Sequence, residues 1–254
     1  MHARRRHDEI VKILRQEGTI RVSALAGSLG VSEMTVRRDL ELLSAEGVVE
    51  KFHGGAALVG RPTADEPGFD VKRTMETEAK ESIARRAASR VRPGSSVGLT
   101  AGTTTWMLAK YLDVRPLTVV TNSISVAEVF YPRASPTLDV VLTGGVRTPS
   151  DALVGPVAVS SLSTLHIDTL FMGVHGMTEK AGFTTPNLLE AETNRAFIRG
   201  AAELVVVADH TKFGVTGLST ICPLSTVDAL IVDDELDPTA VDLLRSEIPD
   251  VELV

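Results

Sequence analysis

The stretch Val31-Ser-Glu-Met-Thr-Val-Arg-Arg-Asp-Leu-Glu-Leu-Leu43 has the spacing of an amphipathic helix. Its apolar residues recur at i, i+4 and i+7 and form one stripe that can pack on a core: Val36, Leu40 and Leu43. Ser32 is a good N-cap because its side-chain oxygen can accept a hydrogen bond from a first-turn amide. Gly47 suits a left-handed residue just past the helix end. The polar side of this helix is left to contact a partner.

Two further helical patterns precede this stretch. Residues 7–17 carry an apolar stripe followed by Gly18, and residues 22–29 carry a second stripe that ends at Gly30. The turn before the quoted helix is short enough for a helix-turn-helix. After Gly47, two short apolar runs flank the sequence His53-Gly-Gly55, as in a hairpin. Three helices and a hairpin in residues 1–60 predict a winged helix-turn-helix domain.

The second helix of such a motif enters the major groove of DNA, which predicts the contacting residues. Arginine can read guanine with two hydrogen bonds or bind phosphate, and the sequence leaves open which arginine does which. An isolated arginine pair could equally be a solvated helix face, and His53 an ordinary turn residue. Arg4 to Arg6 could follow the DNA backbone or form a solvated end. The predicted DNA-contacting residues are Ser32, Glu33, Met34, Thr35, Arg37, Arg38 and His53.

The charge of the chain is distributed unevenly. The net charge of −7 would by itself argue against a nucleic-acid partner. Residues 1–60 contain nine Lys or Arg and eight Asp or Glu, which leaves 17 against 25 for the remainder. The acidic excess therefore lies outside the predicted DNA-binding domain, which can approach phosphates.

Length and composition are those of a two-domain globular protein. The chain has 254 residues, of which 43% are hydrophobic. No apolar run approaches the roughly 20 residues that span a bilayer, and no signal-peptide pattern follows the first arginines. We therefore expect a cytoplasmic protein without a membrane partner. The single cysteine, Cys222, excludes an internal disulfide and a cysteine-rich zinc site.

The pattern changes after a linker, which prolines and glycines place at residues 61–74. Aliphatic runs then alternate with helical stripes. A helical stripe at residues 83–91 comes first. The predicted strands are then 96–99, 117–121, 140–143, 169–172, 204–208 and 229–232, and the predicted helices between and after them are 105–112, 124–130, 157–165, 188–200 and 238–247. Such alternation indicates a doubly wound, mainly parallel α/β domain over residues 75–254.

Small polar residues follow four of the predicted strands, where a doubly wound sheet binds ligands. Glycine permits close backbone approach, while hydroxyls and helix-start amides can donate to phosphate. One such loop could be an ordinary turn, but four together favour a site for a small phosphorylated metabolite. Glu190, Asp209 and Lys212 could bind sugar or phosphate, or serve as caps and surface ion pairs. The predicted effector-binding residues are Gly102, Thr103, Thr104, Thr105, Asn122, Ser123, Gly144, Gly145, Gly173, Gly176, Glu190 and Lys212.

No metal or cofactor is expected in this domain. His175 and His210 have no partners at metal-ligand spacing. No segment matches the GxxxxGK[ST] nucleotide-binding loop.

Several motifs make the chain similar to a known family. They are residues 31–40, His-Gly-Gly-Ala at 53–56, Ala-Gly-Thr-Thr-Thr at 101–105, Thr-Asn-Ser at 121–123, Gly-Gly at 144–145 and Ala-Asp-His-Thr-Lys-Phe-Gly at 208–214. In their order and spacing the chain resembles the DeoR family of bacterial sugar-metabolism regulators. The resemblance implies an oligomeric cytoplasmic repressor, a sensor domain similar in fold to ribose-5-phosphate isomerase, and release of repression by a phosphorylated sugar. The chain departs from the family at Thr100, where Asp is common, and at Asn194, where Lys is common.

The leading hypothesis is a repressor of a sugar-catabolism operon that binds double-stranded operator DNA as a homo-oligomer. The alternative is a sugar-phosphate isomerase-like enzyme with a DNA-binding appendage. The missing cation at Asn194 weakens that alternative, because isomerisation needs a poised acid or base and a group that stabilises an oxyanion. We therefore expect no catalytic residues. An activator is a third possibility, since the sequence does not encode the sign of regulation.

Overall fold

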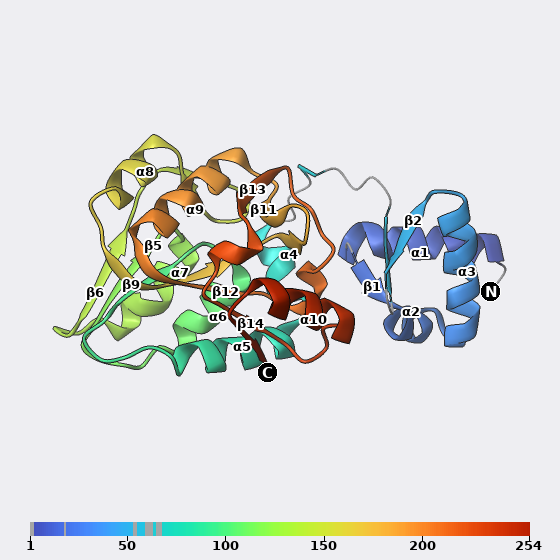
Figure 1. Cartoon of the computed structure of the whole chain (residues 1–254), viewed down its shortest axis with the longest axis horizontal. Coiled ribbons are helices and arrows are strands. Elements are labelled where there is room, and N and C mark those ends of the chain that lie inside the picture. Colours follow the sequence, from blue (N-terminus) through green and yellow to red (C-terminus); the bar gives the residue numbers. More distant parts are fainter. Residues whose placement is uncertain (1–2, 18, 53–54, 59–62, 65–67) are drawn as a thin grey trace. The chain divides into compact units, whose positions relative to one another are not determined.

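The computed structural model describes residues 3–17, 19–52, 55–58, 63–64 and 68–254. The chain divides into two compact units, residues 1–63 and residues 64–254 (Figure 1). In the described parts of both units, no helix has the length and apolar character needed to cross a membrane.

The N-terminal unit is the expected winged helix-turn-helix. Its helices are α1 (Ala3–Glu17), α2 (Val22–Leu29) and α3 (Glu33–Ala45), and its antiparallel sheet has the order β1-β3-β2, with β1 (Thr19–Arg21), β2 (Val49–Phe52) and β3 (Gly55–Leu58). The predicted stripe of α3 is buried against Ile10 and Leu14 of α1 and Leu25 of α2. The sequence analysis missed β1, because three residues are too few to show an alternating pattern.

The predicted ends of α3 are confirmed by its capping geometry. The Ser32 side chain accepts a hydrogen bond from the amide of Thr35 at 3.3 Å. Gly30 and Gly47 have φ values of +63° and +69°, a left-handed conformation that side chains other than glycine rarely adopt. These two turns set the directions in which the chain enters and leaves α3.

The second unit contains a seven-stranded, wholly parallel sheet with the order β15-β14-β12-β9-β4-β5-β6. The strands are β4 (Ser96–Leu99), β5 (Leu117–Thr121), β6 (Leu138–Leu142), β9 (Ile167–Gly173), β12 (Ala201–Val207), β14 (Ala229–Val232) and β15 (Asp250–Leu253). The chain runs outward from β4 to β6, returns to β9 on the other side of β4, and then runs outward to β15. The doubly wound prediction is therefore confirmed, with β15 as an additional strand.

Helices cover both faces of this sheet (Figure 1). Alternate strand residues face opposite layers: Phe171 packs with α5, α6 and α7, whereas its neighbours Leu170 and Met172 pack with α9 and α10. The helices of the unit are α4 (Phe69–Arg73), α5 (Thr77–Ala88), α6 (Thr103–Tyr111), α7 (Ile124–Phe130), α8 (Pro156–Leu162), α9 (Leu188–Gly200) and α10 (Pro238–Glu247).

Two small antiparallel sheets are formed by strands in the connections after β6, β9 and β12. One pairs β7 (Val146–Arg147) with β8 (Leu153–Val154). The other has the order β10-β11-β13, with β10 (Gly176–Thr178), β11 (Gly182–Thr185) and β13 (Ser219–Cys222). These short strands are not among those predicted from the sequence, because strands of two to four residues carry no strong periodic signal.

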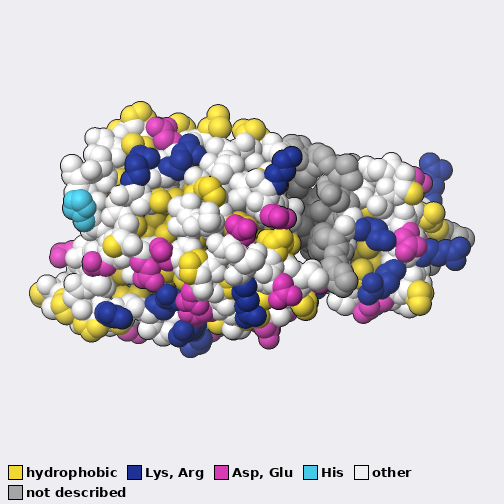
Figure 2. Space-filling model, in the orientation of Figure 1, with side chains coloured by type: hydrophobic (Ala, Val, Ile, Leu, Met, Phe, Trp, Pro, Cys, Tyr) yellow, Lys and Arg dark blue, Asp and Glu magenta, His cyan; other side chains and the backbone are white. Residues whose placement is uncertain are grey.

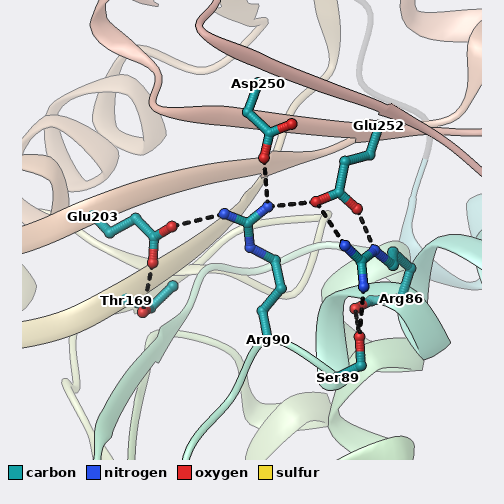
Figure 3. Close-up of polar contacts among 7 residues, drawn as sticks. All are labelled: Arg86, Ser89, Arg90, Thr169, Glu203, Asp250 and Glu252. Atoms are coloured by element: carbon teal, nitrogen blue, oxygen red, sulfur yellow. Dashed lines mark hydrogen bonds and ion pairs between the residues drawn. The ribbon is translucent and has the colours of Figure 1, made fainter.

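An ion-pair network ties the end of α5 to β12 and β15 (Figure 3). The Arg90 guanidinium lies 2.9 Å from Glu203 on β12, and 2.9 Å and 2.6 Å from Asp250 and Glu252 on β15. Arg86 also pairs with Glu252. These contacts hold the edge strand β15 against the sheet at its amino-terminal end, away from the edge where ligands bind in such folds.

Part of the predicted linker belongs to the second unit. Residues 69–73 form α4, and the ring of Phe69 packs edge-on against Trp106 with 5.9 Å between ring centroids. The Phe69 amide also donates to the carbonyl of Pro149 at 3.2 Å. The sequence analysis missed this helix because five residues with one buried side chain show no stripe.

Candidate functional site

The exposed side of α3 carries the residues predicted to contact DNA. Ser32, Glu33, Arg37 and Arg38 are exposed, and Met34 is 78% exposed. Thr35 is half-buried, and its hydroxyl lies 2.9 Å from that of Ser32. His53 lies outside the described residues. Figure 2 shows Lys and Arg side chains, with acidic ones among them, on the N-terminal unit at the right of the view.

A buried carboxylate on α3, which the sequence analysis did not select, holds α3 against α1. The Asp39 side chain is 4% exposed and accepts from Arg6 at 2.5 Å and 2.8 Å. His7 Nε2 lies 3.0 Å from the same carboxylate. Burial alone would raise the pKa of Asp39, but the hydrogen bonds from Arg6 and His7 hold it below its ordinary value. Arg6 therefore neither follows DNA nor forms a solvated end in this structure; it orients α3.

The second candidate site lies where the strand order reverses, between β4 and β9. The Thr100 amide donates to the carbonyl of Phe171 at 3.2 Å, and the Gly173 amide donates to the Thr100 hydroxyl at 3.1 Å. A Cβ placed on Gly173 would lie 3.9 Å from the Cα of Gly102. The loops after β4 and β9 are therefore in contact at the carboxyl edge of the sheet, the ligand position of doubly wound folds.

Helix α6 begins in this place without a side-chain cap. Its N-cap is Gly102, which makes no side-chain hydrogen bond, and Thr103 and Thr104 open the first turn. The first amides of a helix have no acceptor within it, and the positive end of the helix dipole attracts anions. The geometry suits a phosphate group, as the sequence predicted from these residues.

Three of the predicted effector residues are buried and hydrogen-bonded within the fold. Thr105 donates to the carbonyl of Thr100 at 2.6 Å. Asn122 accepts from the amide of Ala101 at 2.9 Å and donates to the carbonyl of Leu153 at 3.1 Å. Ser123 accepts from the amide of Val126 at 3.2 Å and caps α7. These side chains position the loops of the site, and their contact with an effector stays a prediction.

Glycine is needed for backbone packing at two of the predicted positions. A Cβ on Gly145 would lie 2.5 Å from the carbonyl oxygen of Val154, and a Cβ on Gly176 would lie 2.1 Å from that of Val215. Gly144 has a positive φ of +72° and turns the chain after β6. The packing of the backbone accounts for Gly145 and Gly176 without a ligand.

Glu190 is part of a hydroxyl cluster near the start of α9. Its carboxylate accepts from Thr148 at 2.8 Å and from Thr185 at 3.0 Å, and it also accepts from Ser150. Thr148 and Ser150 belong to the loop between β7 and β8, so Glu190 joins this loop to α9 and β11. Its capacity to accept further hydrogen bonds from a sugar is correspondingly small.

A buried group of charges lies beyond the carboxyl end of β12. Asp209 is fully buried, and its Oδ1 accepts from the amide of Thr211 at 3.2 Å. Its Oδ2 has no hydrogen-bond partner in the described structure and lies 3.5 Å from Lys212 Nζ. Burial alone would raise the pKa of Asp209, whereas Lys212 and Lys80 hold it below its ordinary value. An unpartnered buried carboxylate oxygen is costly and can accept a hydrogen bond from a ligand.

Lys80 is the functional candidate that the sequence analysis missed. It is 2% exposed, and its ammonium donates to the carbonyls of Lys72 at 2.8 Å and Met75 at 2.5 Å. Burial lowers its pKa to about 8, although the attraction of Asp209 acts in the opposite direction. A signal was available in the sequence: Lys80 precedes Ile83 and Ala84 by three and four residues, and therefore lies on their apolar stripe.

The structure also brings together three side chains that could hold a metal ion, His210, Asp233 and Glu235. His210 Nδ1 lies 2.6 Å from Asp233, which also accepts from the His210 backbone amide at 2.7 Å. Glu235 is 4.0 Å from Nε2. We interpret this group as a hydrogen-bonded link between the ends of β12 and β14, because Asp233 is already the acceptor of two short hydrogen bonds.

Replacing Asp39 with Asn should loosen α3 in the full-length protein. Losing charge-assisted hydrogen bonds costs about 1.5–3 kcal/mol, which should appear as faster hydrogen exchange of the α3 amides. Because the folded-state pKa is lowered, the stabilisation is present above about pH 4 and is lost as the pH falls through the folded-state value. Exposed Asp8, replaced with Asn, is the matched control. Equal exchange in both variants would contradict the role given to Asp39.

Comparison with known proteins identifies a family for both parts of the chain. The chain matches the model of the DeoR-like helix-turn-helix domain over residues 6–61 and that of the DeoR C-terminal sensor domain over residues 75–234. It is 33% identical to a putative aga operon transcriptional repressor of Escherichia coli O157:H7, over 98% of this chain and 93% of that protein. It is 32% identical to the lactose phosphotransferase system repressor of Staphylococcus aureus (strain N315), over 98% of each chain.

Among solved structures, ribose 5-phosphate isomerase A from Methanocaldococcus jannaschii matches 54% of each chain, at 16% identity and a TM-score of 0.39. The family models together cover most of the chain and confirm the resemblance seen in its motifs. The chain belongs to the DeoR family.

Proposed function

We propose that this protein is a transcriptional repressor of a sugar-catabolism operon, and that a phosphorylated sugar releases it from operator DNA. The observation that carries the proposal is the charge group formed by buried Lys80 and Asp209 with half-buried Lys212, in a chain that also has a DNA-binding unit and whose helix α6 begins without a side-chain cap. The relatives named as repressors of the aga operon and of the lactose phosphotransferase system support it.

In this proposal, α3 enters the major groove with Arg37 and Arg38 toward the DNA. Arg37 lies 3.6 Å from Glu33 in an exposed i,i+4 pair. Such pairs contribute little to stability, so Arg37 can exchange Glu33 for a DNA phosphate or base at small cost. Asp39 holds the helix from its buried side while this exchange takes place.

Replacing Arg37 or Arg38 with Ala should weaken binding to the DNA upstream of the protein's own gene. An arginine that reads a base contributes about 1–3 kcal/mol of discrimination. One that binds phosphate mainly lowers affinity for all sequences and reduces the salt dependence by about one charge. Lys12, exposed on α1, is the control for charge alone when replaced with Ala. If both arginine variants bind as the wild type does, α3 is not the recognition helix.

The effector is proposed to bind with its phosphate at the start of α6 and near Lys212. The amides of the first turn and the ammonium group supply donors and positive charge. A sugar hydroxyl can then donate to Oδ2 of Asp209, which accepts no hydrogen bond within the described part of the chain. Lys80, also positively charged below its pKa of about 8, favours an anion in the same place.

Affinity for sugar phosphates should fall as the pH rises through the pKa of Lys80, which is about 8. Deprotonation removes one positive charge from the site, whereas the phosphate is already fully charged above about pH 7. Calorimetric titration with ribose 5-phosphate and galactose 6-phosphate at about pH 7 and about pH 9 measures this. In Lys80→Met, affinity should be lower at the first pH and nearly independent of pH. The exposed Lys180, replaced with Met, should behave like the wild type.

We propose that the sensor unit binds its ligand without converting it. Isomerisation of a sugar phosphate needs an acid or base poised near neutral pH. Asp209 has a pKa held below its ordinary value, and the Glu190 carboxylate already accepts three hydroxyl hydrogen bonds. Neither carboxylate is thus prepared for proton transfer. Aldose–ketose exchange observed with the purified protein would contradict this part of the proposal.

We also propose that the protein acts as a homo-oligomer. β6 is an edge strand whose residues Val140, Val141 and Leu142 are exposed, and its outer backbone groups have no neighbouring strand in the described chain. A second copy offers the same edge, so antiparallel pairing about a two-fold axis would complete the hydrogen bonds of both copies. Sedimentation should show an assembly larger than a monomer that Val141→Lys weakens; a wild-type monomer at micromolar concentration would contradict the proposal.

A further inference from the structure

The short helix α4 lies in the chain directly between the DNA-binding unit and the sensor sheet. The N-terminal unit ends at residue 63, and α4 spans Phe69–Arg73, just before α5. Any signal carried along the chain from the sensor sheet to the DNA-binding unit passes through α4. Such a signal therefore depends on the contacts that hold α4 in place.

Three anchors hold α4, and each belongs to an element of the candidate effector site. The Phe69 ring packs edge-on against Trp106, 5.9 Å away, and the Arg73 guanidinium lies 5.7 Å from the centre of the same ring. The Phe69 amide donates to the carbonyl of Pro149 at 3.2 Å. The carbonyl of Lys72 accepts from Lys80 Nζ at 2.8 Å.

The connection from these anchors to the site is short in each case. Trp106 directly follows residues 102–105, which form the uncapped start of α6. Pro149 lies between Thr148 and Ser150, whose hydroxyls donate to Glu190. Lys80 is a member of the buried charge group with Asp209 and Lys212. A ligand that displaces the start of α6 or attracts Lys80 acts directly on the contacts of α4.

The turn that joins α4 to α5 is strained. Glu76 has a φ of +46°, a left-handed conformation that is unfavourable for a residue with a Cβ. Such a conformation persists only where neighbouring contacts impose it. The contact beside it is the hydrogen bond of 2.5 Å from Lys80 Nζ to the carbonyl of Met75. Loss of this hydrogen bond would allow the turn to relax.

We propose that α4 is the coupling element of the protein: it is docked on the sensor unit in the DNA-binding state and released when the effector binds. The inference rests on the effector site proposed above. An ammonium forms stronger hydrogen bonds with a phosphate than with neutral carbonyls, so a bound phosphate draws Lys80 from Lys72 and Met75. The strained turn then relaxes, and Phe69 leaves Trp106. A ligand shifts this equilibrium only by its difference in affinity for the two states, which the Lys80 hydrogen bonds supply.

The chain contains its own probe for this change, because Trp106 is its only tryptophan. Phe69→Ala and the double variant Phe69→Ala/Arg73→Ala remove the α4 side chains that contact the indole, whereas Lys110, whose Nζ lies 3.5 Å from the ring centre, is kept in every variant. Val71→Ala, at a position of α4 that is 54% exposed, is the matched control. Tryptophan emission and operator affinity are measured for the full-length proteins, with and without galactose 6-phosphate and ribose 5-phosphate, and far-UV circular dichroism checks the fold.

Without any ligand, the two Phe69 variants should show red-shifted emission and should bind operator about 5-fold to 150-fold more weakly, the range typical of allosteric coupling. Val71→Ala should match the wild type. The sugar phosphate that releases the wild type from DNA should red-shift its emission, and should still bind the Phe69 variants without weakening their operator binding further.

Two outcomes would overturn the inference. One is a red-shifted Phe69 variant whose operator affinity is unchanged, which would show that α4 release does not reach the DNA-binding unit. The other is unshifted emission in the double variant, which would show that these side chains do not dock α4. If no sugar phosphate binds the wild type while the Phe69 variants still lose operator affinity, the proposed effector class fails and the coupling role of α4 stands.

Discussion

A charge that is buried in a protein must be paired or hydrogen-bonded, and this constraint organises both units. In the N-terminal unit, Arg6 and His7 satisfy the Asp39 carboxylate and thereby hold α3 against α1. In the second unit, Lys212 is close to Asp209, but one oxygen of this carboxylate accepts no hydrogen bond from any residue that the structure describes. The satisfied charge stabilises a recognition helix. The incompletely satisfied charge leaves a place where a ligand can be bound.

The reversal of strand order supplies the location of the second candidate site. Because the chain leaves β4 in one direction and returns to β9 on its other side, the loops after both strands meet at one edge. Buried hydroxyl and amide groups, such as those of Thr105 and Asn122, fasten these loops to one another. The start of α6 remains uncapped. The site thus has a rigid frame and free donors, a combination that suits anion binding.

The buried ammonium of Lys80 connects this site with the segment that leads to the DNA-binding unit. Its hydrogen bonds end on two carbonyls that flank a strained turn, and its charge faces Asp209 and Lys212. One side chain therefore belongs both to the proposed effector site and to the contacts that place α4. In the proposed coupling the effector acts through Lys80, since a ligand shifts an equilibrium only through interactions that differ between the two states.

Local spacing in the sequence determined the winged helix-turn-helix, the cap at Ser32, the exposed arginines of α3 and the parallel α/β class, because these features depend on residues within one helix or strand. Only the tertiary structure decided which polar residues use their hydrogen bonds to hold the fold together. Thr105, Asn122 and Ser123 have the composition of ligand-binding loops but are buried in internal hydrogen bonds. Asp39 accepts a hydrogen bond from Arg6, which is 33 residues away in the sequence. The charge of Asp209, which is also distant in the sequence, acts on Lys80. Such pairs arise when separate elements pack together, so no spacing in the chain reveals them.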